Sequence, residues 1–206
     1  MPKKVDHQQR REQIAAALMR VVANDGLEAV SLRHVAAEAG VTAGMVQHYF
    51  PSKEAMMDFA MQSASARYEA QVTEAIAMLG EDPPVRKLIR TLLVTMLPLD
   101  ESGRANGRVA LAFHAHAATR REAAEHLGED TAGLRDFIAG LLRSAQDAGR
   151  VGSAIDPAHA AAVLVAVTDG LALHLLSHDL RSDTAAAALD AQLDLIFGAD
   201  ARSGAR

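Results

Sequence analysis

Residues 31–54 read SLRHVAAEAGVTAGMVQHYFPSKE, and their spacing decides the fold of the first part of the chain. Two short helices that cross steeply need a small residue at the crossing, a turn residue that tolerates a positive φ, and an apolar residue on the second helix. Ala36, Gly40 and Val46 supply these features in order, and Val41 fills the turn. The stretch therefore predicts a helix-turn-helix, with an ordinary pair of core helices as the alternative.

Capping residues and turn residues place the other helices. Asp6 stands three residues before Gln9, which is a capping-box spacing, and Gly26 is expected to end the helix that follows. Short capping side chains stand before four further segments: Ser31, Thr42, Ser52 and Asp156. The apolar spacing predicts helices over about 6–26, 31–40, 42–49, 53–79, 84–97, 105–118, 120–149 (one helix or two), 156–178 and 183–197. The chain is therefore expected to be all-α, with about nine helices.

The composition favours a helical core and argues against several classes of protein. Hydrophobic residues make up 50% of the 206 residues and aromatic residues only 3%, and a core rich in Ala, Leu and Val is typical of packed helices. The sequence has no cysteine, no Gly-rich phosphate loop, no nucleophile elbow and no HExxH pattern, so a helical enzyme is the less favoured alternative and no cofactor is expected. No apolar signal region or membrane-length apolar run is found, so we expect a cytoplasmic protein without membrane contact.

Charge is distributed unevenly along the chain. Residues 1–53 carry seven Lys and Arg against five Asp and Glu, a balance of +2, whereas the remainder carries 14 against 21, a balance of −7. The two values sum to the net charge of −5. Because the phosphate backbone of DNA attracts positive charge, the N-terminal segment is the part expected to meet nucleic acid.

The pattern VAxxAGVTxGxVxHYFxSKE at residues 35–54 resembles the DNA-binding signature of the TetR (tetracycline-repressor) family. The resemblance extends over about residues 8–58, and it is specific because Tyr-Phe-x-x-Lys directly follows the second helix of the motif. It implies a three-helix DNA-binding domain over residues 1–52 and a helical ligand-binding and dimerisation domain over 53–206. It also implies a homodimeric repressor that binds a palindromic operator in double-stranded DNA and is released by a small-molecule effector. An activator of the same fold is the alternative.

Side-chain chemistry assigns roles within this motif. Gly44 lets the second helix approach the DNA groove, and Thr42 at the start of that helix offers a hydroxyl and backbone N–H groups to a phosphate. Gln47 stands where the family commonly has an aromatic residue, and its amide can pair bidentately with adenine. Tyr49 supplies either a phenol to a phosphate or a packing contact. The residues expected to contact DNA are Ser31, Arg33, Thr42, Ala43, Gly44, Gln47, His48, Tyr49 and Lys53.

The segment from Asp156 to Leu171 resembles the penultimate helix of many family members, which forms a dimer bundle together with the last helix. Its apolar face is too broad for one packing partner, and Gly170 removes a side chain where two helices could cross closely. The alternative is a core helix buried within a single chain. Six residues are expected at the dimer interface: Val163, Val167, Gly170, Leu171, Leu189 and Leu193.

Residues 84–150 are needed neither for DNA binding nor for the dimer, and the resemblance implies that they sense a ligand. We expect a mostly apolar small molecule in a cavity with a few polar groups. The candidate ligand contacts are Thr95, Met96, Phe113, His114, Phe137 and His174. His114 and His116 are two residues apart, so only one of them can point inward from a helix. His174 and His178 have a spacing that could hold a metal ion, but the sequence places no third ligand and no metal is assigned.

Overall fold

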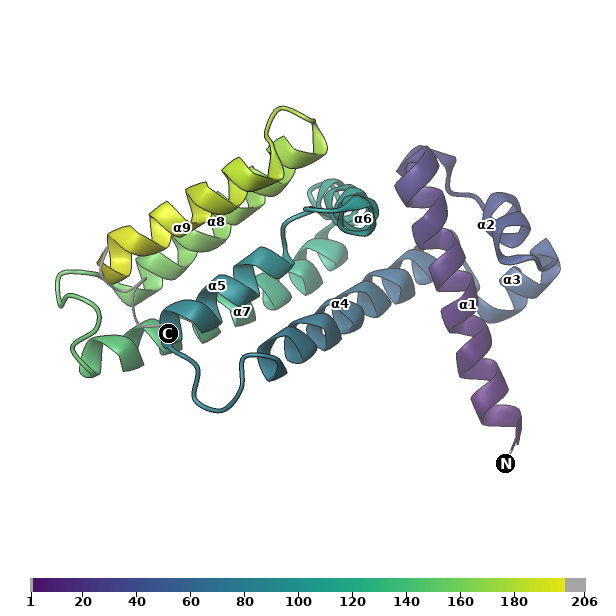
Figure 1. Ribbon diagram of the computed structural model, residues 1–206. Coiled ribbons are helices and arrows are strands. Elements are labelled where there is room, and N and C mark those ends of the chain that lie inside the picture. The colour runs from purple at the N-terminus through teal and green to yellow at the C-terminus, as the bar shows by residue number, and fades with distance from the viewer. Residues whose placement is uncertain (1, 199–206) are drawn as a thin grey trace. The chain divides into compact units, whose positions relative to one another are not determined.

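The computed structural model describes residues 2–198, and these residues form nine α-helices, one short 3-10 helix and no β-strand (Figure 1). The predicted all-α fold is therefore confirmed, and residues 120–149 contain one helix. The helices are α1 (Pro2–Asp25), α2 (Leu32–Ala39), α3 (Ala43–Tyr49), α4 (Lys53–Ala77), α5 (Val85–Thr95), α6 (Glu101–Ala117), α7 (Arg121–Asp147), α8 (Pro157–Leu176) and α9 (Ser182–Phe197), with the 3-10 helix η1 (Leu27–Ala29) after α1.

The chain divides into two compact units. The first unit consists of Met1–Glu69 and Arg108–Ala124, and the second of Ala70–Gly107 and Glu125–Arg206. Neither unit is continuous in the chain, because α4, α6 and α7 each contribute residues to both. A functional division at residue 53 therefore stays a prediction.

The first helix begins earlier than the sequence predicted. α1 starts at Pro2, so Asp6 lies inside the helix and does not cap it. Proline suits the first turn of a helix, where its missing N–H is not needed, and the Lys, Gln, Arg and Glu residues that follow are good helix formers. The predicted end is confirmed, since α1 stops at Asp25 and Gly26 has a φ of 82°.

The other predicted caps are confirmed. The hydroxyl oxygens of Ser31, Thr42 and Ser52 each accept a hydrogen bond from the N–H three residues on, at 3.0–3.2 Å. The carboxylate of Asp156 accepts from two N–H groups in the first turn of α8, both at 2.9 Å. Each such cap stabilises a helix start by about 1 kcal/mol, so these starts are fixed by local chemistry.

The core of the second unit is formed by α5, α7, α8 and α9. Helices α8 and α9 lie side by side in Figure 1, and both also contact α5. Apolar side chains from all four helices meet in one cluster with no exposed surface: Ile89, Leu93, Ile138, Leu142, Leu164, Leu175, Leu189 and Leu193. Burial of this kind is the main stabilising term for a helical unit.

An ion-pair network that the sequence did not predict ties α5 to α9. Arg90 binds Asp190 with both ends of its guanidinium group, from Nε to Oδ1 at 2.7 Å and from Nη2 to Oδ2 at 3.0 Å. Arg86 Nη2 donates to Asp194 Oδ1 at 2.8 Å. The hydrogen bond from Arg90 is the main reason that the pKa of Asp190 lies below its ordinary value of 3.8. Such charge-assisted pairs are geometrically demanding, so they fix the register of the two helices.

Asp190→Asn is expected to destabilise the chain at neutral pH by about 1–3 kcal/mol, because it removes hydrogen bonds to a charged partner. The pKa of Asp190 is lower in the folded chain than in the unfolded one. The carboxylate therefore stabilises the fold above pH 3.8, and this contribution is lost as the pH falls through the folded value. Urea unfolding at pH 7 and pH 3 measures the effect, which should shrink at the lower pH. Asp179→Asn, in an exposed pair with His174, is the control and should change little.

Candidate nucleic-acid interface

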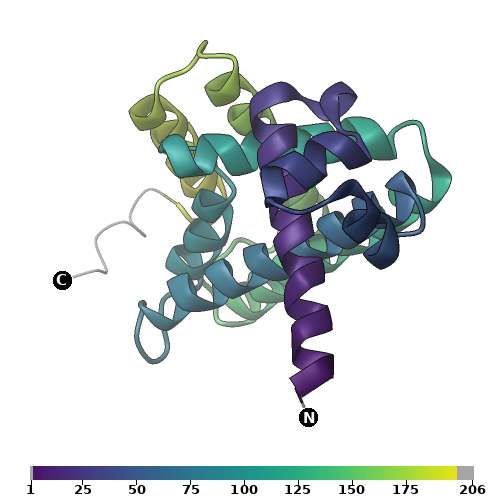
Figure 2. The same ribbon diagram turned by 90° about the vertical axis from the view of Figure 1, so that its right-hand side faces the viewer.

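Helices α2 and α3 form the predicted helix-turn-helix, which Figure 2 brings toward the viewer together with α1. Gly40 adopts the left-handed conformation, with φ 68° and ψ 32°, at the end of α2. The next N–H group, that of Val41, donates to the carbonyl of Ala36 at 2.9 Å and closes the turn. Ala36 and Val46 are both buried at the crossing of the two helices. Sequence and structure therefore agree on this motif residue by residue, apart from Val41, which is only half-buried.

Helix α1 holds α2 in place through two polar contacts. Arg20 Nε donates to Glu38 Oε1 at 2.5 Å, and its Nη2 donates to the Glu38 carbonyl at 3.2 Å. Gln13 Nε2 donates to the carbonyl of Ala39, the last residue of α2, at 2.8 Å. The first contact pairs one cation and one carboxylate of the N-terminal segment, so it leaves the net charge of that segment unchanged.

The outward face of α3 is opposite Val46, which is buried. At 100° per residue, Gly44 and His48 lie near the centre of that face, and Gln47 lies to one side of it. All three are exposed. The residues predicted to approach base edges therefore share one accessible face.

Gly44 has no role in the packing of the free chain. A Cβ built at this position would meet no atom within 4 Å, and the residue has ordinary helical geometry. Glycine is a poor helix former, so its use at an open position in a short helix costs stability. The predicted close approach of this helix to DNA would account for that cost.

The candidate phosphate contacts surround this face. Ser31, Arg33 and Thr42 are exposed, and Ala43 and Lys53 are half-buried. The oxygens of Ser31 and Thr42 accept hydrogen bonds from the helices that they cap, so each hydroxyl hydrogen remains able to donate to an anion.

Charge at the start of α4 is arranged around Lys53. The neighbouring carboxylate of Glu54 lies 3.8 Å from Arg120, so its negative charge is partly balanced. His116 is half-buried in the same region, and burial is the main reason that its pKa is lowered, with the charge of Arg120 acting in the same direction. Two cations, Lys53 and Arg120, and two carboxylates, Glu54 and Asp58, therefore lie around His116 at the start of α4.

Tyr49 makes a packing contact, which is one of the two roles that the sequence left open. Its ring centroid lies 4.6 Å from that of His7 on α1 and 5.2 Å from that of His48, so it packs between two imidazoles. The side chain is half-buried, and a contact between its hydroxyl and a phosphate stays a prediction. The sequence missed His7, because no local pattern links a residue near the start of α1 to the end of α3.

Arg11 contributes to the positive charge of the N-terminal segment, but its side chain packs against aromatic rings of the first unit. Its guanidinium carbon lies 4.2 Å from the ring centroid of Phe59 and 5.2 Å from that of Phe50. Its Nε is buried without a hydrogen-bond partner among the described residues. This cation–π contact joins α1 to α4, and Phe50 is fully buried.

The candidate dimer residues separate into two groups. Val163 is 47% exposed on α8, and Val167, Gly170 and Leu171 are half-buried. The last two candidates need a correction, since they lie in the core of the second unit and have no exposed surface: Leu189 and Leu193. They are buried because that face of α9 packs against α5 and α8 of the same chain. The sequence missed the exposed apolar residues on these helices, Leu173 (49%) and Leu195 (75%).

The candidate ligand residues do not gather in one unit. Phe113 and His114 belong to the first unit, and the other four belong to the second. Phe113 is buried, Thr95 and Met96 are half-buried, and three candidates are exposed: His114, Phe137 and His174. Of the two histidines on α6, His116 is half-buried and His114 is exposed.

His174 and His178, whose spacing could have held a metal ion on one helix face, are not both helical. His178 has a φ of 58° and lies beyond the end of α8, so it does not share a helix face with His174. His174 Nδ1 instead lies 3.0 Å from Asp179 Oδ2. No group of three metal-ligating side chains occurs among the residues that the structure describes.

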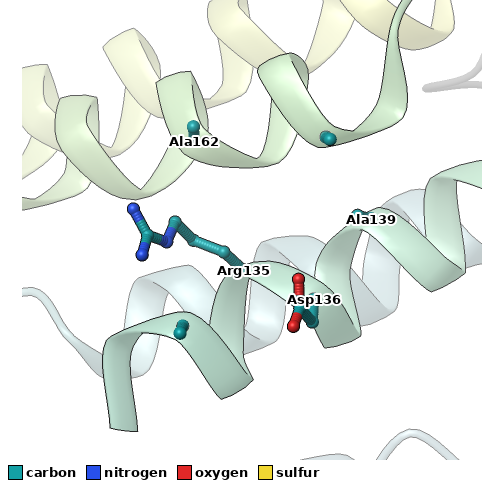
Figure 3. A pocket seen from close by; sticks show the side chains of 6 residues that line it. Arg135, Asp136, Ala139 and Ala162 are labelled. Atoms are coloured by element: carbon teal, nitrogen blue, oxygen red, sulfur yellow. The ribbon is translucent and has the colours of Figure 1, made fainter. Parts of the chain in front are cut away.

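A pocket of about 210 Å³ lies between α7 and α8. Figure 3 shows Arg135 of α7 extending toward α8, with Asp136 beside it. Alanines form the rest of the lining: Ala132, Ala139, Ala158 and Ala162. None of the candidate ligand residues lines this pocket.

The arrangement of α1, α2 and α3 defines a DNA-binding transcriptional regulator of the helix-turn-helix class. Residues 14–58 match the family described as bacterial regulatory proteins, tetR family, and residues 84–198 match the BetI-type transcriptional repressor, C-terminal family. The chain belongs to the TetR family of transcriptional regulators, as the resemblance of residues 35–54 implied.

Comparisons over most of the chain agree. The HTH-type transcriptional regulator PksA of Bacillus subtilis (strain 168) is 33% identical over 184 residues, which cover 88% of this chain and 85% of PksA. A transcriptional regulator from Rhodococcus sp. Rha1 has a similar structure, with a TM-score of 0.80, 32% identity, and coverage of 90% of this chain and 95% of that one. A regulator from Saccharomonospora viridis, solved in complex with choline, has a TM-score of 0.83 and 20% identity, over 91% and 96% of the two chains. These relatives are transcriptional regulators and not enzymes.

Lys53→Ala and Gln47→Ala are expected to affect DNA binding in different ways. Loss of a phosphate contact weakens binding to all sequences alike and flattens the salt dependence of log K by about 0.9 for each contact. Loss of a bidentate base contact costs about 1–3 kcal/mol on the preferred sequence and relaxes the preference at that position. Affinity at several salt concentrations, together with selection from random duplexes, separates the two. An unchanged consensus for Gln47→Ala would contradict its base-reading role.

Proposed function

We propose that the chain is a cytoplasmic, homodimeric repressor that binds a palindromic operator and leaves it when a small molecule binds. Residues 1–52 would provide the DNA-binding domain, and residues 53–206 the dimer and the effector site. The BetI-type repressor match over residues 84–198 supports repression over activation. Occupied operator DNA blocks transcription without any further activity of the protein.

The main observation in favour of a dimer is that α8 is largely exposed in the single chain. This helix is apolar along most of its length, yet only 28% of its most apolar 18-residue window is buried in the single chain. Val163 and Leu173 each leave about half of their side chains in water. An apolar surface of this kind is stabilised when another apolar surface covers it. We propose that a second copy of the chain covers this apolar surface with its own α8.

A lipid bilayer is the other partner that such a helix could have. By length and composition α8 is the one described helix that could cross a membrane. However, Asp169 is an exposed carboxylate in its middle, and a charged group near the centre of a bilayer is costly. The neighbouring α9 packs along α8 and carries Asp190 and Asp194, which bind arginines of the same chain. These features favour an interface between proteins.

Two copies of the chain present two α3 helices. Recognition helices of a dimer read half-sites about 34–36 Å apart, so the operator should be a palindrome. The nine candidate contacts from Ser31 to Lys53 form the proposed surface for each half-site. Support comes from the open position of Gly44 and from the exposure of six of the nine: Ser31, Arg33, Thr42, Gly44, Gln47 and His48.

The effector is proposed to be a small, mostly apolar molecule bound by the helical region after residue 84. The Saccharomonospora viridis regulator was solved with choline, which makes a quaternary ammonium compound the natural comparison. Such cations are bound by cages of aromatic rings. This chain has no tryptophan, two tyrosines and five phenylalanines, and Tyr49, Phe50 and Phe59 belong to the DNA-binding motif and its support. The composition therefore favours an apolar effector over choline.

One set of measurements tests the proposal. Light scattering at micromolar concentration should give a dimer, and selection from random duplexes should yield a palindrome. Transcription from a promoter that overlaps this palindrome should fall when the protein is added. Apolar compounds should release the DNA more effectively than choline. A monomer, an asymmetric site or activated transcription would each contradict the corresponding part of the proposal.

A further inference from the structure

The recognition helix presents an apolar side chain that none of the roles above uses. Met45 is 37% exposed on α3, where every other large exposed side chain is polar. At 100° per residue, it lies on the accessible half of the helix, beside the central Gly44 and His48 and across from Gln47. Val46, which follows it, faces the core and is fully buried.

The hydrogen bonds that Met45 makes in the free chain come from its backbone and not from its side chain. Its backbone N–H donates to the hydroxyl oxygen of Thr42 at 3.2 Å and to the carbonyl of the same residue at 3.0 Å. Any residue with an N–H group makes these bonds, so they do not call for methionine. Thioethers are flexible and polarizable, and they adapt to irregular apolar surfaces of a partner.

We propose that Met45 packs against the 5-methyl group of a thymine in each operator half-site and thereby contributes to sequence specificity. The thymine methyl is the apolar group that base pairs display in the major groove, so it is the natural contact for an apolar side chain there. The adjacent Gly44 allows the helix close enough for such a contact. This inference rests on the proposed reading of the operator by α3.

Replacement of single thymines by uracil tests the proposal, because it removes the methyl group and keeps base pairing. For the parent protein, uracil at one position of each half-site should weaken binding about fourfold for each methyl group lost. Met45→Ala should bind the thymine and uracil duplexes equally at that position. Met45→Leu, which keeps an apolar side chain, should retain most of the discrimination. Met78→Ala, at an exposed methionine in the second unit, is the matched control and should behave like the parent.

Two results would overturn the inference, and they are distinguishable. If the parent binds its selected operator tightly but no uracil substitution has an effect that depends on Met45, the methyl contact is wrong and DNA reading by α3 stands. If selection yields no preferred duplex, both this inference and the proposed operator recognition fail. Equal melting temperatures of the parent and the Met45 variants would show that the comparison reports on contacts with DNA.

Discussion

Gly170→Arg is expected to convert the dimer into a folded monomer and to weaken operator binding by about 10² to 10⁴-fold. Gly170 lies on α8 between the exposed side chains of Val163 and Leu173, and a Cβ built there would meet no atom within 4 Å. Arginine therefore fits on the single chain but places a long cation where the partner helix is proposed to pack. A monomer contacts only one half-site and therefore loses the affinity gained by binding two half-sites at once. That gain sets the expected range of about 10² to 10⁴-fold.

Light scattering and operator affinity measure the two effects, and circular dichroism shows whether the helices remain. Gly128→Arg is the matched control, because Gly128 is a helical glycine of α7 that also has open space around it. Leu173→Glu places a charge on the same surface of α8 without a change at a glycine, and it should also give a monomer. If both α8 variants remain dimeric, the dimer interface must lie on another surface of the chain.

The parts of the fold that the sequence predicted are those determined locally. Ser31, Thr42 and Asp156 each bond to N–H groups within three residues, and Gly40 needs only its own positive φ. Nearby residues therefore carry the whole signal for helix starts and for the turn. The helix-turn-helix could be placed for this reason, down to the buried face of α3.

The parts that were missed depend on partners far away in the chain. Arg90 and Asp190 are 100 residues apart, and no spacing rule connects them. Arg11 is 48 residues from Phe59 in the sequence, and no local pattern indicates that its guanidinium group lies over that ring. Sequence periodicity shows that α9 has an apolar face, but it does not say which structure covers that face. Leu189 was therefore assigned to a dimer interface although it is buried within one chain.

The same limit explains why the ligand candidates are dispersed over the chain, whereas the candidate DNA contacts are close together. The candidate DNA contacts follow one another within 23 positions of the sequence and lie on or beside two short helices. The ligand candidates come from four helices and a helix end, and they are divided between two units. A site built from distant segments is decided by packing, and a single sequence contains little information about such packing.

Gly44→Glu is expected to abolish specific DNA binding while leaving the chain at least as stable as before. The side chain meets nothing in the free protein, and replacement of glycine in a helix raises stability by up to about 1 kcal/mol. An acidic residue near the start of α3 is also favoured by the helix dipole. In a complex, however, the same side chain would bring volume and negative charge to the phosphates and base edges at the centre of the recognition face.

Operator affinity should fall by about 10³-fold or more, to the level of non-specific binding, because neither α3 of the dimer could enter its groove. Thermal unfolding should show an unchanged or higher midpoint, and light scattering an unchanged dimer. Gly44→Ala, which adds one methyl group, should lose less affinity than Gly44→Glu, and Gly128→Glu should bind like the parent. If Gly44→Glu binds the operator normally, α3 is not the element that enters the groove; if it loses binding and stability together, the glycine is needed for the fold and not for the approach to DNA.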